Sequence, residues 1–175
     1  EESHADTIIS HANAKETFLK LVDRRETPDE FQGHIRNIRT KSSCFKVHIG
    51  ADKLPQFPAF VARRRGFDYP SQVRIGSTVD YHEDAYADSK RGGYPKRPFL
   101  TIHIPSMYDR TIAPEGKHLI SVFGQYGPYQ LAEGTWDSRR AEVQQQFIAL
   151  IEDFAPDFGD CIAHAEVLGP PDIEN

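Results

Sequence analysis

The sequence predicts an α+β fold with a mixed, largely antiparallel sheet of about five or six strands and helices packed on one face. Two stretches carry this prediction, Phe99–Ile104 and His118–Tyr126, because apolar and polar residues alternate in both. A period of two is typical of a strand with two unlike faces. Turn-forming residues separate the two stretches, so they are expected to be antiparallel neighbours at the centre of the sheet.

The N-terminal part begins with a short apolar run. Residues 6–10, DTIIS, predict a strand, and Asn13 or Ser10 is suited to cap the helix that follows. Thr27 and Pro28 then predict the start of a second helix, which should end near Arg39. The apolar residues expected to face inward from this second helix are Phe31, Ile35 and Ile38.

Three further stretches are predicted to join the sheet. Cys44–Gly50 alternates clearly, Val73 and Ile75 mark a brief strand, and Cys161–Leu168 forms the last one. Because proline cannot donate a ladder hydrogen bond, Pro170 and Pro171 are expected to end the ordered pattern.

Two longer helices are predicted between these strands. Ser77 is expected to cap a helix over residues 78–90. The residues expected on its inner side are Val79, His82 or Glu83, Tyr86 and Ala87. Thr135 or Asp137 is expected to cap the longest helix, which ends near residue 154. Its predicted apolar stripe is Val143, Phe147, Leu150, Ile151 and Phe154.

Length and composition narrow the class of protein. The chain has 175 residues, which predicts a single domain over 1–175. The net charge of −5 argues against a nucleic-acid partner, since phosphate binding needs clustered positive charge. No stretch approaches the roughly 18 apolar residues of a transmembrane helix, and no signal peptide is visible. Cys44 and Cys161 lie in strand patterns, which favours buried thiols in a reducing, cytoplasmic compartment.

Common catalytic and cofactor motifs are absent from the sequence. It contains no GxGxxG, GxxxxGK or GxSxG, and no CxxC or histidine spacing typical of zinc. No residue stands out as a general acid or base. The sequence therefore predicts no metal and leaves the catalytic residues unknown.

Histidines in the predicted strands are the first candidates for a site. His48 and His103 are compatible with surface or structural roles, and equally with one wall of a pocket. In the second interpretation Gln125 and Tyr126 would line the same pocket. The two interpretations differ in whether one face of the sheet meets solvent or a ligand.

An aromatic cluster follows the second central strand. Phe123, Tyr126, Tyr129 and Trp136 are compatible with core packing, and also with an apolar ligand wall in which phenol hydroxyls orient the ligand. Composition alone does not distinguish these alternatives.

One long segment and several short motifs are similar to those of a known family. The long segment is DTIISHANAKETFLKLVD, in which an apolar strand leads into a short helix. The shorter motifs are IPS, DRTIAPEGKH, QYGPY, the following WD and FIALIEDFAPDF. Together they cover nearly the whole chain, and through them it resembles the phytoene desaturase-like FAD-dependent oxidoreductases of the flavin amine oxidase superfamily.

The resemblance implies a fragment of a longer protein. In such proteins FAD is held by an N-terminal glycine-rich fold and a C-terminal glycine-rich segment, and this chain lacks both. Residues 1–175 then match the substrate-binding domain, with residues 1–12 forming a strand of the FAD-binding half. Ser10 and Ala12 are carried over as positions near FAD, and no FAD is expected on this chain alone.

The same resemblance suggests a function. The parent protein would use FAD to remove a hydride from an apolar or amine-like small molecule, with the sheet face bearing Thr101, His103, Phe123 or Gln125 toward the substrate. Its expected partner is the FAD-binding remainder of the parent chain. The alternative is a non-catalytic module that binds a lipid, an isoprenoid-like ligand or a protein partner, with homodimers forming through the exposed inter-domain surface.

Overall fold

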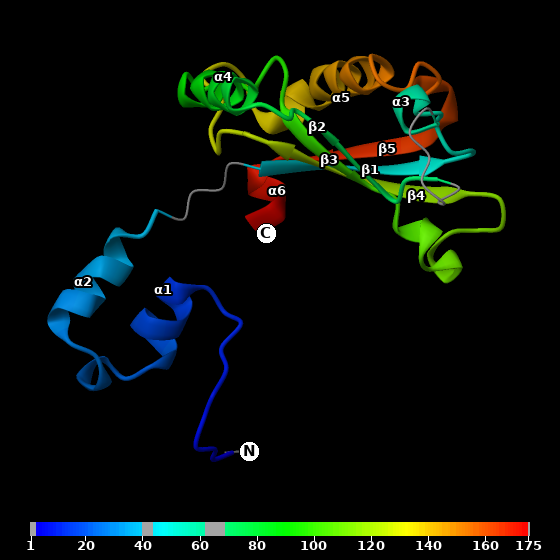
Figure 1. Ribbon diagram of the computed structural model, residues 1–175. Helices are drawn as coiled ribbons and strands as arrows, with labels where there is room; N and C mark the ends of the chain where they lie inside the picture. Colours follow the sequence, from blue (N-terminus) through cyan, green and yellow to red (C-terminus); the bar gives the residue numbers. More distant parts are fainter. Residues whose placement is uncertain (1–2, 40–43, 62–68, 175) are drawn as a thin grey trace. The chain divides into compact units, whose positions relative to one another are not determined.

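The computed structural model describes residues 3–39, 44–61 and 69–174. It divides the chain into two compact units, Glu1–Lys41 and Ser42–Asn175 (Figure 1). The chain length is compatible with one domain or with one domain and a small lobe, and the structure separates an N-terminal helical part from the sheet. That the whole chain serves as one substrate-binding domain of a longer protein stays a prediction.

The described part of the first unit is built from short helical segments. These are α1 (Ala14–Glu16), the π-helix η1 (Thr17–Leu21), the 3-10 helix η2 (Arg24–Glu26) and α2 (Asp29–Asn37). Asn13 caps α1, as predicted, by accepting the backbone N–H of Glu16. The rings of Phe18 and Phe31 meet edge to face at 5.0 Å, and buried Gln32 donates to the carbonyl oxygen of Phe18 at 3.0 Å. These contacts join the helical segments into one unit.

Two predictions for this unit are wrong. Residues 6–10 form no strand, and the side chain of Ile9 is 92% exposed. A strand needs a hydrogen-bonding neighbour, and the described residues of this unit supply none. Ile35 of α2 is buried as expected, but Ile38 lies just beyond the end of α2 and is exposed.

The second unit is organised around a five-stranded sheet with the order β2-β3-β4-β1-β5. Its strands are β1 (Cys44–Ala51), β2 (Gln72–Ile75), β3 (Phe99–His103), β4 (His118–Gln125) and β5 (Ile162–Leu168). Every pairing in this sheet is antiparallel. The predicted α+β class is confirmed, and β3 and β4 are neighbours with β4 at the centre.

One face of the sheet is covered by helices. α4 (Val79–Lys90), α5 (Trp136–Glu152) and the short α3 (Pro58–Val61) lie on this side (Figure 1). Phe45 of β1 meets Phe147 of α5 edge to face, with ring centroids 4.7 Å apart. The other strand residues buried in this core are Val47, Ile49, Leu100, Ile102, Ile120 and Val122. We call this side the covered face.

The helix α4 is less deeply packed than its sequence suggests. Thr78 rather than Ser77 caps it, accepting the backbone N–H of Tyr81 at 3.3 Å. Val79 is 76% exposed and Tyr86 is also exposed, so the prediction is wrong for these two, whereas His82 and Ala87 are half-buried. Ala85 is the buried residue of this helix, because α4 presents only a narrow side to the rest of the unit.

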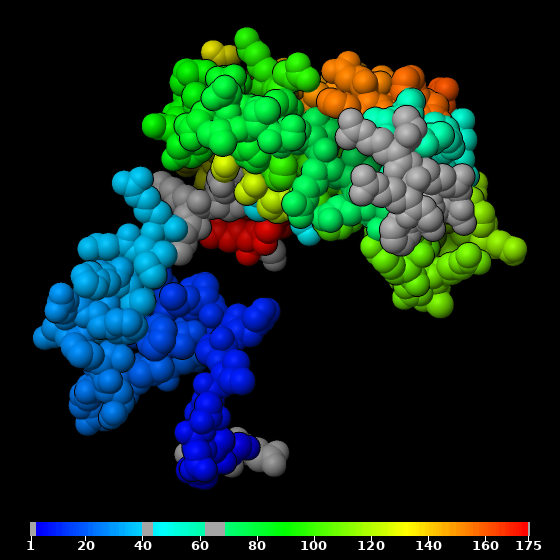
Figure 2. Space-filling view, viewed as in Figure 1, coloured from blue at the N-terminus to red at the C-terminus, as the bar shows by residue number. Residues whose placement is uncertain are grey.

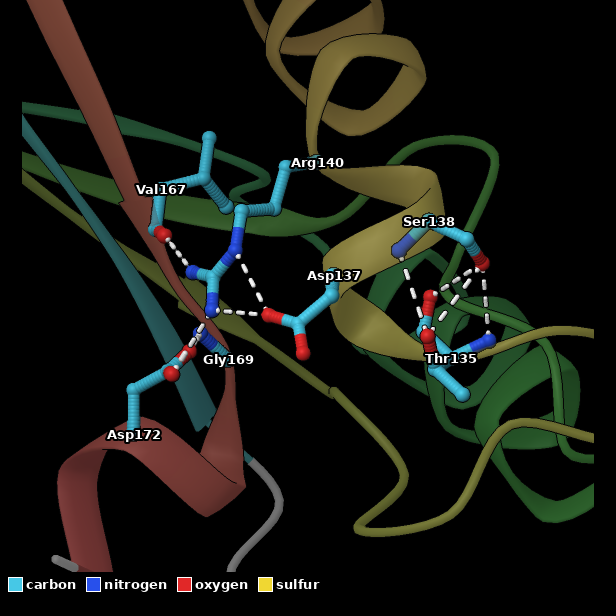
Figure 3. A network of polar contacts seen from close by, with 7 residues as sticks. All are labelled: Thr135, Asp137, Ser138, Arg140, Val167, Gly169 and Asp172. Atoms are coloured by element: carbon cyan, nitrogen blue, oxygen red, sulfur yellow. Dashed lines mark hydrogen bonds and ion pairs between the residues drawn. The ribbon is translucent and has the colours of Figure 1, made fainter.

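The helix α5 agrees more closely with expectation. A capping box joins Thr135 and Ser138 at its N-terminus, since each side chain accepts the backbone N–H of the other residue (Figure 3). Its apolar stripe is buried as predicted, apart from Phe154, which follows the end of the helix at Glu152 and is exposed.

Two short segments lie on the side opposite α4 and α5. The helix α6 (Pro170–Glu174) follows β5, where the sequence predicts the end of ordered structure. Proline suits the first turn of a helix, because its missing N–H would have no partner there. Near the other end of the sheet, the loop with 3-10 helices η3 (Pro105–Met107) and η4 (Arg110–Ile112) extends away, and Figure 2 shows it as a protruding lobe.

Arg140 connects α5 to β5 and α6. Its guanidinium donates to the carbonyl oxygen of Val167, to Asp137 Oδ1 at 2.6 Å and to Asp172 Oδ1 at 2.7 Å (Figure 3). The other oxygen of Asp172 accepts the backbone N–H of Gly169 at 2.8 Å. This network holds α6 at the end of the last strand.

Candidate functional site

We call the side of the sheet that faces away from α4 and α5 the open face. Two rows of side chains cross all five strands on this side. Strand register places directly paired residues on the same face, so each row crosses all the strands. The first row is Arg74, Thr101, Phe123, Lys46 and Leu168. The second row is Gln72, His103, Ser121, His48 and Glu166.

The second row is a polar ladder. Directly opposed residues have Cβ atoms roughly 5 Å apart, so Ser121 has an imidazole on each side. Gln72 Nε2 lies 3.2 Å from His103 Nε2. His103 is exposed and His48 is half-buried. In the described part of the chain no hydrogen bond joins Ser121 to either histidine, so the row offers no activated serine nucleophile.

The first row mixes charge with apolar surface. Phe123 lies between Thr101 and Lys46, and Leu168 lies on the other side of Lys46. Phe123 and Leu168 are half-buried, while Arg74 is exposed. Such a row can bind a ligand and fix its orientation, but it contains no acid–base pair for catalysis.

The structure brings together most of the residues predicted to line a pocket. His48, His103 and Phe123 share the open face, and Gln125 lies on the same side by alternation, at the end of β4. The sheet therefore unites residues that are far apart in the sequence. Their function as a substrate wall stays a prediction.

The predicted tyrosines lie elsewhere. The ring of Tyr126 meets Tyr86 of α4 at 5.2 Å, and the hydroxyl of Tyr129 donates to Glu174 of α6. Trp136 is buried beside Phe45, which favours core packing for this member of the cluster. The aromatic cluster thus does not form one wall.

Residues that the sequence did not single out complete the open face. They are Lys46, Gln72, Arg74, Ser121, Glu166 and Leu168. Each occupies a position that alternates with the buried apolar residues of its strand, so the sequence pattern could have placed it on the open face. Their alignment across strands depends on register, which a single sequence does not give.

The two residues that the family resemblance places near FAD, Ser10 and Ala12, lie in the first unit. Ser10 and Ala12 are exposed, and the Ser10 hydroxyl is hydrogen-bonded to the Thr17 hydroxyl at 2.8 Å. A flavin dinucleotide needs backbone N–H groups at a glycine-rich turn for its pyrophosphate, and these residues provide no such cradle. The described residues therefore do not fit FAD by themselves, and the placement of Ser10 and Ala12 near FAD stays a prediction.

A cavity of about 530 Å³ lies beside the loop after β3. Buried Ser106 accepts the backbone N–H of Leu119 at 3.2 Å and lies 3.4 Å from His118 Nδ1. Burial lowers the pKa of His118, which favours its neutral form. The nearby Lys117 is paired with Asp52 at 2.7 Å. A contact of 3.4 Å is long for a serine–histidine pair, so this cavity is a weaker candidate than the open face.

A second cavity, of about 400 Å³, lies between the end of α4 and α5. Tyr94 donates its hydroxyl proton to Glu142, which is also paired with Arg139 at 3.0 Å. Burial, together with Glu142, raises the pKa of Tyr94 to about 12. Glu142 thus pairs with both groups, which favours a structural role, although the buried Nε of Arg139 has no hydrogen-bond partner among the described residues.

Two general properties of the described residues bear on the kind of site. They contain no group of three or more histidine, cysteine, aspartate or glutamate side chains suited to a metal. None of their helices has the length and apolar character needed to span a bilayer.

Comparison with known proteins gives one consistent result. No family model matches the chain. The protein of Rattus norvegicus named pyridine nucleotide-disulfide oxidoreductase domain-containing protein 2 is 32% identical over 183 aligned residues, which cover 99% of this chain and 31% of that protein. The protein of the same name from Mus musculus gives the same values. The chain is therefore similar, over nearly its whole length, to one segment of these two proteins, whose names describe an oxidoreductase domain. The chain spans 31% of the length of these relatives.

Proposed function

We propose that this chain is the substrate-binding part of a longer FAD-dependent oxidoreductase, which removes a hydride from an apolar or amine-like substrate. The observation that carries the proposal is the match over 99% of this chain to only 31% of proteins named for an oxidoreductase domain. The chain has no dinucleotide-binding motif and aligns to only one segment of such a protein. We therefore assign it to substrate binding and not to cofactor binding.

The one-sided sheet supports this assignment. Its covered face is a close-packed core, so the strands are rigid and fix the positions of the open-face side chains. Within the second unit neither α4 nor α5 lies over the two rows; α6 and the loop with η3 and η4 lie on this side, near its two ends (Figure 1). Since the described residues do not fit FAD, the proposal assigns the hydride acceptor to the remainder of the longer protein.

A chimera tests the proposal. In the rat relative, the aligned segment is replaced by residues 1–175, and the visible absorption of the purified chimera is compared with that of the unaltered rat protein and of the chain alone. We expect flavin absorption in the rat protein and in the chimera, and none in the chain alone.

Two results would contradict this assignment. Flavin bound to the chain alone would mean that the cofactor site has been misplaced. An unaltered rat protein without flavin would remove the flavin argument and favour the non-catalytic binding module.

A further inference from the structure

The open face differs in charge from the protein as a whole. The chain has a net charge of −5. The two rows of the open face instead hold two fixed positive charges, Lys46 and Arg74, and one fixed negative charge, Glu166. In the described part of the chain no ion pair involves Lys46 or Arg74. Lys117 and Arg140 of the same unit are paired with carboxylates, whereas Lys53, like Lys46 and Arg74, has no ion pair in the described residues. The two open-face cations are therefore available to a ligand.

Apolar side chains lie directly beside these cations. Lys46 stands between Phe123 and Leu168 in its row, and Arg74 is separated from Phe123 by the buried Thr101. Paired positions lie roughly 5 Å apart, so the Cβ atom of Lys46 is about 5 Å from that of Phe123 and the Cβ atom of Arg74 is about 10 Å from it. A ligand whose apolar body covers Phe123 can reach either cation with a charged group.

We propose that the open face binds an amphiphilic anion, an apolar body that carries a carboxylate or phosphate. This inference rests on the proposed function and narrows its substrate class to apolar molecules that carry an anionic group, which excludes the amine-like ones. A neutral apolar ligand would cover Lys46 and leave a desolvated charge without a partner, which is unfavourable. An amine would add repulsion. An anionic group compensates the cation with a charge-assisted hydrogen bond, while the apolar body packs on Phe123 and Leu168.

The test compares ligands that share one apolar chain. The 175-residue chain is labelled with ¹⁵N and titrated with dodecanoate, dodecyl phosphate, dodecanol or dodecyltrimethylammonium, each below its micelle concentration, while backbone amide shifts are recorded. We expect saturable shifts at β1 and β4 with both anions. Dodecanol should bind about tenfold more weakly, which corresponds to the loss of one charge-assisted contact, and the cationic probe should not saturate.

Variants assign the effect to the two cations. The double variant Lys46→Gln/Arg74→Gln should weaken dodecanoate binding about tenfold and leave dodecanol binding unchanged. Lys53→Gln is the matched control, because Lys53 is an exposed cation outside the two rows. The amide spectrum of each variant also reports whether it is folded.

Several outcomes would overturn the inference. Equal affinity for dodecanoate and dodecanol, or dodecanoate binding that the double variant does not weaken, would exclude recognition of the anionic group. Shifts confined to residues 3–39, or no saturable shift with any probe, would exclude the open face as the site. In each case the flavin content of the chimera still decides the proposed function separately.

Discussion

The two faces of the sheet are made by the same strands and differ almost completely in chemistry. In β1, Phe45 and Val47 enter the core under α5, while Lys46 and His48 lie on the open face. Successive side chains of a strand point to opposite sides, so a single position along the chain separates the two environments. The covered face therefore determines stability, and the open face is free to determine binding.

Truncating one phenylalanine on each face gives the largest expected contrast. Phe45 is fully buried between Phe147 and Trp136, so Phe45→Ala should lower the free energy of unfolding by about 3–5 kcal/mol through lost burial and a cavity. Phe123 is half-buried on the open face, and Phe123→Ala should cost about 1 kcal/mol. Urea unfolding followed by circular dichroism measures both. Equal losses would mean that the open face is packed as a second core.

Adding one methyl group to each face tests the same contrast in the opposite direction. A Cβ at Gly124 would lie 2.5 Å from the ring of Phe45 and 2.9 Å from that of Phe147. Gly124→Ala should therefore destabilise the protein by about 1–3 kcal/mol through overpacking.

Gly50 is the matched control for this substitution. It belongs to the open-face phase of β1, and a Cβ there would meet no atom within 4 Å. Gly50→Ala should change the free energy of unfolding by less than about 0.5 kcal/mol in the same urea experiment. A loss at Gly50 as large as that at Gly124 would contradict the difference between the faces.

The strands could be predicted because their apolar alternation follows directly from one face being buried. Cys44–Gly50 and Phe99–Ile104 are examples, and their apolar phase is the covered face. Helix stripes were predicted less well where burial is shallow, as for Val79 of α4. Residues 6–10 have the composition of a strand but no neighbouring strand in the described residues of their unit.

The candidate site was predicted only in part, because it depends on pairing between distant strands. His48 and His103 could be identified as polar residues within strands. Lys46 and Arg74 become candidate binding residues only through the strand register, which places them in the same row as Phe123. Tyr126 adjoins the open-face residue Gln125 in sequence, yet its ring contacts α4. Tertiary contacts of this kind are not encoded in local patterns.

The Arg140 network joins a helix of the covered face to α6 on the opposite side, and it supplies the smallest predicted effect. The hydrogen bond from Arg140 holds the pKa of Asp172 below its ordinary value. Asp172→Asn removes this charge and should lower the free energy of unfolding at neutral pH by about 1–2 kcal/mol, the range expected for a hydrogen bond to a charged group.

The pH dependence gives this prediction a definite sign. Because the folded pKa of Asp172 is lowered, the unfolded chain binds more protons below about pH 3.9, and stability rises with pH across that window. The stabilisation is complete above the unfolded pKa and is lost as the pH falls through the folded one, so the difference between Asp172→Asn and the parent chain should shrink in acid.

Asp137→Asn is the control, since Asp137 bonds to the same arginine but its side chain is 83% exposed, against 27% for Asp172. Its loss should be a few tenths of a kcal/mol, about the value of an exposed ion pair. Urea unfolding at a series of pH values measures both variants, and a loss at Asp172 that persists unchanged in acid would show that α6 is held by packing rather than by this carboxylate.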